Sequence, residues 1–231
     1  MSDLVKFSKI CKMEKEASEK LNNFFSGSKK ISFKKGETIL RPDDEPHGVF
    51  YLKEGYTRLY SISKNAQELT LIIYKPGEFF PLVWAINNTH NAYYLEALTN
   101  VEIYRAPRNE FIKFIKSNNE LMYEINVRIL QRLEGALRRM EYAMFGNARS
   151  KVASIILICA ERFGDKNKNQ VLIKVPLTHQ DIAKLIGMAR ETVSIEMKKL
   201  QQMGLIDYKG KHLVVKDYSK LKGESALGLI D

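Results

Sequence analysis

The stretch "LTHQDIAKLIGMARETVSIEMKKLQQMGLI", residues 177–206, contains two short amphipathic patterns on either side of a glycine. Thr178 and Asp181 have the spacing of a capping box, which predicts that a helix starts directly after Thr178. Gly187 ends this helix and permits a tight turn, and a second helix is predicted to begin near Ala189 or Arg190. Two short helices joined in this way are typical of a helix-turn-helix motif.

The second predicted helix carries Val193, Met197 and Leu200 at positions i, i+4 and i+7, so these side chains should be its buried face. A small residue in the first helix, Ala183, suits a place where two helices cross closely. The apolar face of the first helix is predicted to consist of Ile182, Ala183 and Ile186.

The opposite face of the second helix is polar at its start and could enter a DNA groove. Arginine can bind guanine O6 and N7 together, and glutamate can accept from cytosine N4. The alternative is a solvated polar face on two packed helices. The predicted base-reading residues are Arg190, Glu191, Ser194 and Ile195. The predicted phosphate contacts are Thr178, His179, Gln180, Thr192, Lys198, Lys209 and Lys211.

The segment that follows, "GLIDYKGKHLVVKD" (residues 204–217), reads as a strand, a Lys-Gly-Lys turn and a second strand. A hairpin directly after a helix-turn-helix predicts a wing, with Lys209, Lys211 and His212 placed to meet phosphates. This second element favours DNA binding over the solvated-face alternative.

Upstream, residues 30–106 contain many short strand-like runs separated by glycine and proline turns, which is typical of a β-sandwich or jelly roll. Helical periodicity begins near Pro107, and a long helix is predicted from about Asn119 to Phe145. Gly146 breaks it, and Asn147 can cap the next helix, which should end at Gly164. The polar segment "GDKNKNQ" after it is predicted to be a loop.

The long helix repeats large apolar residues at spacings of 3, 4, 3 and 4, which is a heptad pattern. Two heptads are short, so an ordinary buried helix face is the alternative to a dimer seam. The predicted seam comprises Leu130, Leu133, Leu137, Met140 and Met144.

The charge favours an anionic partner: the net charge is +10, and residues 147–231 hold 15 Lys and Arg against 9 Asp and Glu. Two cysteines, Cys11 and Cys159, form neither a disulfide framework nor a four-cysteine metal site. Cys159 lies in an apolar helical pattern and is predicted to be a small core residue. The N-terminus has no signal-peptide pattern and no run resembles a membrane span, so we expect a cytoplasmic protein without membrane contact.

Over nearly its whole length the chain resembles the Crp–Fnr family of bacterial transcription factors, most specifically in "THQDIAKLIGMARETVS" and also in "KKGETILRPDDEPHGVFYLKEGYTRLY". The resemblance implies an α+β fold with an N-terminal β-roll like a cyclic-nucleotide-binding domain, a long dimerisation helix and a C-terminal winged helix-turn-helix. We expect a sensor domain over residues 1–118 with a helical lead-in, the dimerisation helix over 119–146 and the DNA-binding domain over 147–231.

The resemblance also places the family's base-reading positions on Arg190, Glu191 and Ser194. The next position is usually arginine in the family, and here it is Ile195. One guanine contact is therefore in doubt, and isoleucine could instead touch a thymine methyl group. We expect a two-fold palindromic operator that differs from the family's two well-known consensus sequences.

The family's known cofactors do not match the sensor region. Pro81-Leu82 and Asn91-Ala92 replace the Gly-Glu and Arg-Ser pairs of the cyclic-AMP-binding members, and a buried phosphate needs a matching cation or amide donors. Cys11 alone cannot supply a cysteine cluster, and neither His47 nor His90 has a second heme ligand. The sequence thus argues against cyclic AMP, an iron–sulfur cluster, heme and any other metal. The residues that could line an effector pocket, or simply fill the core, are Glu78, Phe79, Phe80, Trp84, Asn91, Tyr93 and Tyr94.

These patterns predict a non-enzymatic transcriptional regulator that binds double-stranded DNA as a homodimer, with RNA polymerase and an unidentified small effector as candidate partners. One alternative is a jelly-roll enzyme of the cupin kind, which would need clustered histidine and glutamate ligands. The other is a dimeric interaction module that no longer binds DNA.

Overall fold

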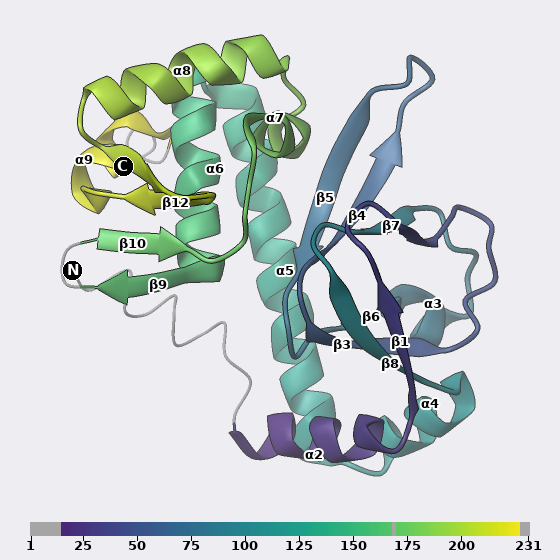
Figure 1. The fold of residues 1–231 in the computed structure, drawn as a ribbon. Coiled ribbons are helices and arrows are strands. Elements are labelled where there is room, and N and C mark those ends of the chain that lie inside the picture. The colour runs from purple at the N-terminus through teal and green to yellow at the C-terminus, as the bar shows by residue number, and fades with distance from the viewer. Residues whose placement is uncertain (1–14, 168–169, 227–231) are drawn as a thin grey trace. The chain divides into compact units, whose positions relative to one another are not determined.

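A computed structural model describes residues 15–167 and 170–226 (Figure 1). Cys11, which the sequence reasoning considered as a cluster ligand, lies outside the described residues. The chain divides into two compact units, one ending at Ile129 and the other beginning at Leu130. Because this division falls inside one long helix, the domain limits inferred from the sequence stay a prediction.

Two antiparallel four-stranded sheets form the first unit, in the orders β1-β8-β3-β6 and β2-β7-β4-β5. This is the β-roll that the family resemblance implied, and the turn-punctuated strand runs had indicated a β-sandwich or jelly roll. The strands are β1 (Lys29–Phe33), β2 (Thr38–Leu40), β3 (Val49–Glu54), β4 (Thr57–Ile62), β5 (Glu68–Tyr74), β6 (Phe79–Phe80), β7 (Tyr94–Ala97) and β8 (Val101–Ala106).

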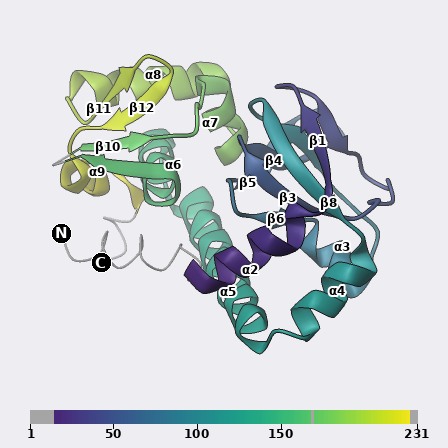
Figure 2. The ribbon, with the colours of Figure 1, turned by 60° about the horizontal axis from the view of Figure 1, so that its bottom comes forward.

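Helices close one side of the first sheet. They are α2 (Lys15–Ser26), α3 (Leu82–Asn87), α4 (Arg108–Lys116) and the first part of α5 (Asn119–Phe145). Leu21, Phe25, Phe111 and Leu121 are fully buried in one apolar cluster that also includes Tyr51 of β3. Figure 2 brings this helical layer forward. Since all four helices contribute to one core, their apolar faces fix them on the sheet.

A second apolar cluster lies between the two sheets and includes Phe50, Phe80, Leu95 and Ile103. The aromatic segment before α3 therefore begins as core: Phe79 and Phe80 form the short strand β6, which pairs with β3. The sequence pattern did not separate β6 and α3 from the surrounding loop because each element is too short to show a period.

The second unit contains the rest of α5, then α6 (Ala148–Phe163), α7 (His179–Ile186), α8 (Arg190–Gln202) and α9 (Tyr218–Glu224). Asn147 caps α6 as predicted, because its side chain accepts from the Ser150 amide at 2.9 Å. A four-stranded antiparallel sheet has the order β11-β12-β10-β9. Its strands are β9 (Gly164–Asn167), β10 (Gln170–Ile173), β11 (Ile206–Lys209) and β12 (His212–Val215).

The segment that begins "GDKN" is not the polar loop that its composition suggested. Residues 164–167 form β9, which pairs antiparallel with β10. All four residues are exposed. Backbone pairing at a sheet edge needs no alternation of apolar side chains, so residues 164–167 carry no period-2 pattern.

Candidate nucleic-acid interface

The first helix of the motif begins at a complete capping box. Thr178 Oγ1 accepts from the Asp181 amide at 3.2 Å, while the Asp181 carboxylate accepts from the Thr178 amide at 2.8 Å. Gly187 ends α7 with φ +65°, a left-handed conformation that a residue with a side chain rarely adopts. The local sequence thus fixes both ends of α7 and the turn that leads into α8.

The buried side of α8 is the one that the spacing predicted. Val193, Met197 and Leu200 are all fully buried, and Ala183 of α7 is buried with them. In α7 the third buried apolar residue is Leu185, whereas Ile186 is half-exposed, so the predicted face was wrong at that position. Ile186 is the last residue of its helix, where the covering of a face is least complete.

With that side buried, α8 presents a polar face at its start. Arg190, Glu191 and Lys198 are exposed, and Ile195 stands among them with 55% of its surface exposed. Thr192 is half-buried. An exposed isoleucine can contact the methyl group of a thymine without leaving a polar group unpaired.

A predicted phosphate contact, His179, and a predicted base-reading residue, Ser194, are hydrogen-bonded to each other. His179 at the start of α7 and Ser194 in the middle of α8 share a hydrogen bond of 2.9 Å between Nδ1 and Oγ. Burial lowers the pKa of His179, and the positive charge of Arg190 lowers it further. The imidazole is therefore held neutral near pH 7. Gln180 and Thr178, the other predicted phosphate contacts on this turn, are exposed.

The wing has the predicted form, with β11 and β12 joined by a turn at Gly210, where φ is +61°. Lys209 and Lys211 flank the turn and are exposed. His212 differs from the prediction in part, because it is half-buried and its Nδ1 lies 3.3 Å from the Ile173 carbonyl oxygen.

One group of ion pairs beside the recognition helix α8 was not predicted from the sequence. Glu196 of α8 is 7% exposed and pairs with Arg149 of α6 at 3.4 Å and Lys199 at 2.7 Å. Arg149 also reaches Glu224 of α9 at 3.5 Å. Burial opposes ionisation of Glu196, but the hydrogen bonds from Lys199 and Arg149 outweigh it, and the pKa of the carboxyl falls. The available signal was helical spacing, since Glu196 lies three residues after Val193 on the buried side.

The predicted seam of the long helix is exposed in the single chain. Its five residues keep between 55% and 74% of their surface exposed, although each has a large apolar side chain. A row of this length that residues 15–167 and 170–226 leave exposed differs from isolated surface apolar residues, which are common. The row is Leu130, Leu133, Leu137, Met140 and Met144.

The residues proposed to line an effector pocket fall into several classes. Phe79 and Phe80 are buried in the two apolar clusters, which is the core alternative that the sequence left open. Glu78 is buried and accepts from the Lys75 amide at 2.9 Å. Trp84, half-buried on α3, lies under the Arg108 guanidinium, whose carbon is 5.7 Å from the ring centroid.

Asn91 and the two tyrosines near it complete the set. The buried Asn91 donates to the backbone carbonyls of Arg41 at 2.6 Å and Tyr93 at 2.8 Å, so its amide holds the loop together. Tyr93 is exposed, and Tyr94 stacks on Tyr60 of the neighbouring strand.

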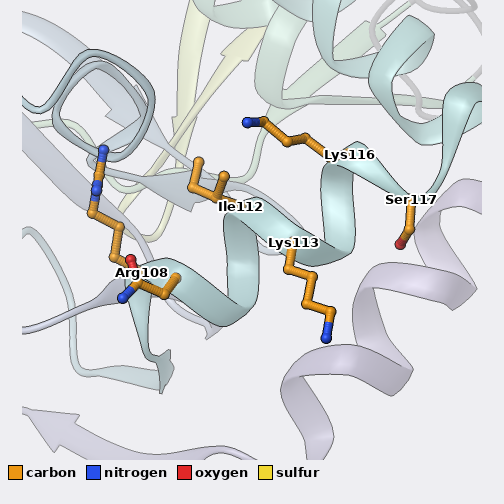
Figure 3. A pocket seen from close by; sticks show the side chains of 6 residues that line it. Arg108, Ile112, Lys113, Lys116 and Ser117 are labelled. Carbon is orange, nitrogen blue, oxygen red and sulfur yellow. The ribbon is translucent and has the colours of Figure 1, made fainter.

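A shallow hollow beside α4 does not involve this set. Figure 3 shows Arg108, Ile112, Lys113, Lys116 and Ser117 around it, all from one helix or the residue after it. His47 and His90 are exposed on loops. Across residues 15–167 and 170–226, no group of three or more histidine, cysteine, aspartate or glutamate side chains could hold a metal ion.

Two family models match the chain in the same order as its two units. The cyclic nucleotide-binding domain matches residues 30–118, and the Crp-like helix-turn-helix domain matches residues 150–224. The chain belongs to the Crp–Fnr family. It is therefore a DNA-binding transcriptional regulator of the Crp–Fnr type, and its β-roll, long helix and winged helix-turn-helix confirm the predicted fold class.

Individual relatives agree with the family. The nitrogen fixation regulation protein FixK of Bradyrhizobium diazoefficiens is 27% identical over 186 residues, which is 80% of this chain and 77% of the relative. The transcriptional regulator SdrP of Thermus thermophilus is 29% identical over 179 residues, covering 76% of this chain and 84% of SdrP.

The solved structure of FixK2 from Bradyrhizobium japonicum superposes with a TM-score of 0.74, covering 86% of this chain and 98% of that one. Its 19% identity supports the Crp–Fnr fold alone. In the part of this chain that the structure describes, no helix is both long enough and apolar enough to cross a membrane.

Proposed function

We propose that this Crp–Fnr regulator binds a two-fold symmetric operator as a homodimer formed through α5. The observation that carries the proposal is the exposed apolar row on α5. The same chain has a recognition helix, α8, whose apolar side is buried against its own unit. Two copies that cover each other's rows would form a coiled-coil seam. Their recognition helices would then enter successive major grooves about 34 Å apart.

Base readout would rest on Arg190, Glu191, Ser194 and Ile195. Arginine would bind the O6 and N7 of a guanine, and Glu191 would accept from the N4 of a cytosine. Ile195 stands where the family usually has arginine, so its half-site should lose one guanine preference and gain contact with a thymine methyl group.

Phosphate contacts would hold this helix in register. The N-terminus of α7 with Thr178, His179 and Gln180 suits an anion, as does Thr192 near the start of α8. Lys198 on α8 and the wing lysines would add charge that depends on salt but carries no base preference. The wing lysines are Lys209 and Lys211.

The signal at the β-roll would be something other than cyclic AMP, heme or an iron–sulfur cluster. Asn91-Ala92 brings no cation to the position where the cyclic-AMP-binding members hold the phosphate, and the Asn91 amide is already bonded to two backbone carbonyls. An effector would have to use the accessible parts of the set, Trp84 and Tyr93. RNA polymerase would be contacted on the promoter once DNA is bound.

Selection of bound sequences from a random DNA pool tests this proposal. The wild-type protein, free of added ligand and at physiological salt, is expected to enrich a palindromic motif. Glu191→Ala should relax one base position in each half-site by roughly 10-fold while the protein stays folded. The control is Lys220→Ala on α9, an exposed residue outside the proposed interface, which should leave the motif unchanged.

The same selection separates the alternatives. A dimeric module that no longer reads DNA would show salt-sensitive binding without any motif, or none at all. A jelly-roll enzyme is not favoured, because the relatives reported above are named as regulators. An unchanged motif in Glu191→Ala would contradict the placement of the recognition helix.

A further inference from the structure

The contact between His179 and Ser194 links the three parts of the motif that would meet DNA. His179 is the first residue of α7, and Ser194 lies on α8, with 2.9 Å between Nδ1 and Oγ. On its other side the imidazole faces Tyr208 of the wing strand β11, with 6.2 Å between the ring centroids. One side chain therefore touches the first helix, the recognition helix and the wing.

The chemistry of this contact decides what Ser194 can offer a base. A serine hydroxyl has one hydrogen to donate, whereas a neutral imidazole has one ring nitrogen that donates and one that accepts. If Nδ1 carries the proton, it donates to Oγ, and the serine hydrogen is free for guanine O6 or N7. If Nδ1 lacks the proton, it accepts the serine hydrogen, and Oγ can only accept, as from cytosine N4 or adenine N6.

The surroundings of the ring leave the imidazole as the group that titrates in this contact. Arg190 on α8 contributes a positive charge that lowers the pKa of the ring. Burial raises the pKa of Tyr208 to about 12. The carboxylate of Asp181, on the same helix, accepts hydrogen bonds from the amide and hydroxyl of Thr178 and not from the ring. A protonated imidazole must donate from both nitrogens, which fixes Ser194 as a donor.

We propose that His179 is a positioning and specificity-determining residue that sets whether Ser194 donates to or accepts from its base pair. We assign Nδ1 as the acceptor of the serine hydrogen in the neutral ring, so when a lower pH adds the second proton the hydrogen bond reverses, and the preference at that base pair shifts towards bases that accept. This role differs from the phosphate contact assigned to His179 above. It rests on the proposed binding of a palindromic operator.

The test is binding selection with an operator randomised at each position in turn, at pH 7.5 and pH 5.5. The wild type is expected to show a preference at one base pair per half-site that changes between the two pH values. His179→Ala and Ser194→Ala should each reduce that preference roughly 3- to 10-fold, the size expected for one hydrogen bond. The double variant should lose no more than either single variant, because the two residues act as one unit.

His179→Asn is the conservative variant, since its amide can donate or accept near the place of Nδ1 but does not titrate. It should keep a preference at this base pair that no longer changes with pH. Gln180→Ala is the matched control, an exposed neighbour on the same turn that should weaken all sequences alike. Thermal unfolding of each variant verifies that it is folded at both pH values.

Three results would overturn the inference. In one, Ser194→Ala changes the base pair while His179→Ala and His179→Asn leave it as in the wild type at both pH values, so the imidazole only supports the helix. In the second, Ser194→Ala also leaves every position unchanged, so Ser194 reads no base. In the third, the wild type selects no motif at either pH, and the proposed operator binding fails together with this inference.

Discussion

Helices α8 and α5 carry large apolar residues at nearly the same spacing, but those of α8 are buried and those of α5 are exposed. On α8, Val193, Met197 and Leu200 are fully buried, whereas the row on α5 that includes Leu137 and Met140 keeps more than half of its surface exposed. On α5 it is the opposite side that turns inward, where Tyr142 is 4% exposed. Periodicity identifies an apolar face, but the surrounding chain decides what covers it.

The apolar faces of α8 and α5 therefore depend on different equilibria, folding for α8 and, as proposed, association for α5. The α8 face is covered by its own chain, so its burial belongs to the folding of one unit. The α5 row is exposed in the single chain, so its burial in the proposed dimer would belong to association and would depend on protein concentration.

The largest effect is expected from Leu137→Asp. A carboxylate in the middle of the proposed seam would have to lose its water on association, so the protein should become monomeric and bind the operator at least about 100-fold more weakly. Folding should be retained, because Leu137 is already exposed in the single chain. Analytical ultracentrifugation measures the first effect and titration with operator DNA the second.

Glu141→Asp is the control for that variant, an exposed position on the same helix outside the row. It should leave both the dimer and operator binding intact. A dimer that persists in Leu137→Asp would place the association surface elsewhere on the molecule.

The next effect in size is expected from Met197→Ala. Deleting a fully buried methionine side chain leaves a cavity and should lower the free energy of unfolding by about 2–5 kcal/mol. The loss should be the same at every protein concentration. Met140→Ala, the exposed counterpart, should lower stability only at concentrations where the dimer forms, which denaturant unfolding at two concentrations can measure. A concentration-independent loss in Met140→Ala would mean that the row is covered within the chain.

How far the sequence could predict this contrast depends on how local each feature is. The capping box at Thr178, the turn at Gly187 and the buried side of α8 depend on residues within one or two turns, and all were predicted. The contact of His179 with Ser194 joins residues 15 apart, and the pair of Arg149 with Glu196 joins residues 47 apart. Neither contact leaves a local pattern.

The sensor region was less predictable for a related reason. A run of aromatic residues is compatible with a ligand pocket and with core, and only the pairing of β6 with β3 places Phe79 and Phe80 in the core. Strand β9 was missed because edge pairing through the backbone imposes no side-chain period. The row on α5 is exposed in the single chain instead of forming an ordinary buried face, and its role as a dimer seam stays a prediction.

A smaller effect should follow from Glu196→Gln, which keeps the shape of the side chain but removes its charge. The pKa of Glu196 is lowered in the folded state, so its ionised form stabilises the fold above the pKa of an unfolded glutamate, near 4.3, and this contribution is lost as the pH falls through the folded value. The expected loss is about 1 kcal/mol at pH 7, since Arg149 and Lys199 are partly exposed.

Denaturant unfolding at pH 7 and below pH 4 measures this difference, which should shrink at the lower pH. Glu191→Gln, on the exposed side of the same helix, is the matched control and should lower stability less than Glu196→Gln at pH 7. A difference that stayed constant from pH 7 to below pH 4 would show that packing, not charge, accounts for the role of Glu196.

The last prediction concerns Cys159 of α6, whose reactivity reports how well the buried apolar faces of the second unit are covered. Burial raises the pKa of the Cys159 thiol to about 12, so almost none of it is thiolate at pH 8. In a Cys11→Ser background, a thiol reagent should modify Cys159 roughly 1,000-fold more slowly than a free cysteine. Because modification then requires opening of the unit around α6, Met197→Ala should accelerate it, whereas Met140→Ala should not at concentrations below dimer formation. Rapid modification of Cys159 in the otherwise unaltered protein would show that the face of α6 that holds it is less well covered than the buried face of α8. Covered and exposed apolar faces would then have to be distinguished between α6 and α8, and not only between α8 and α5.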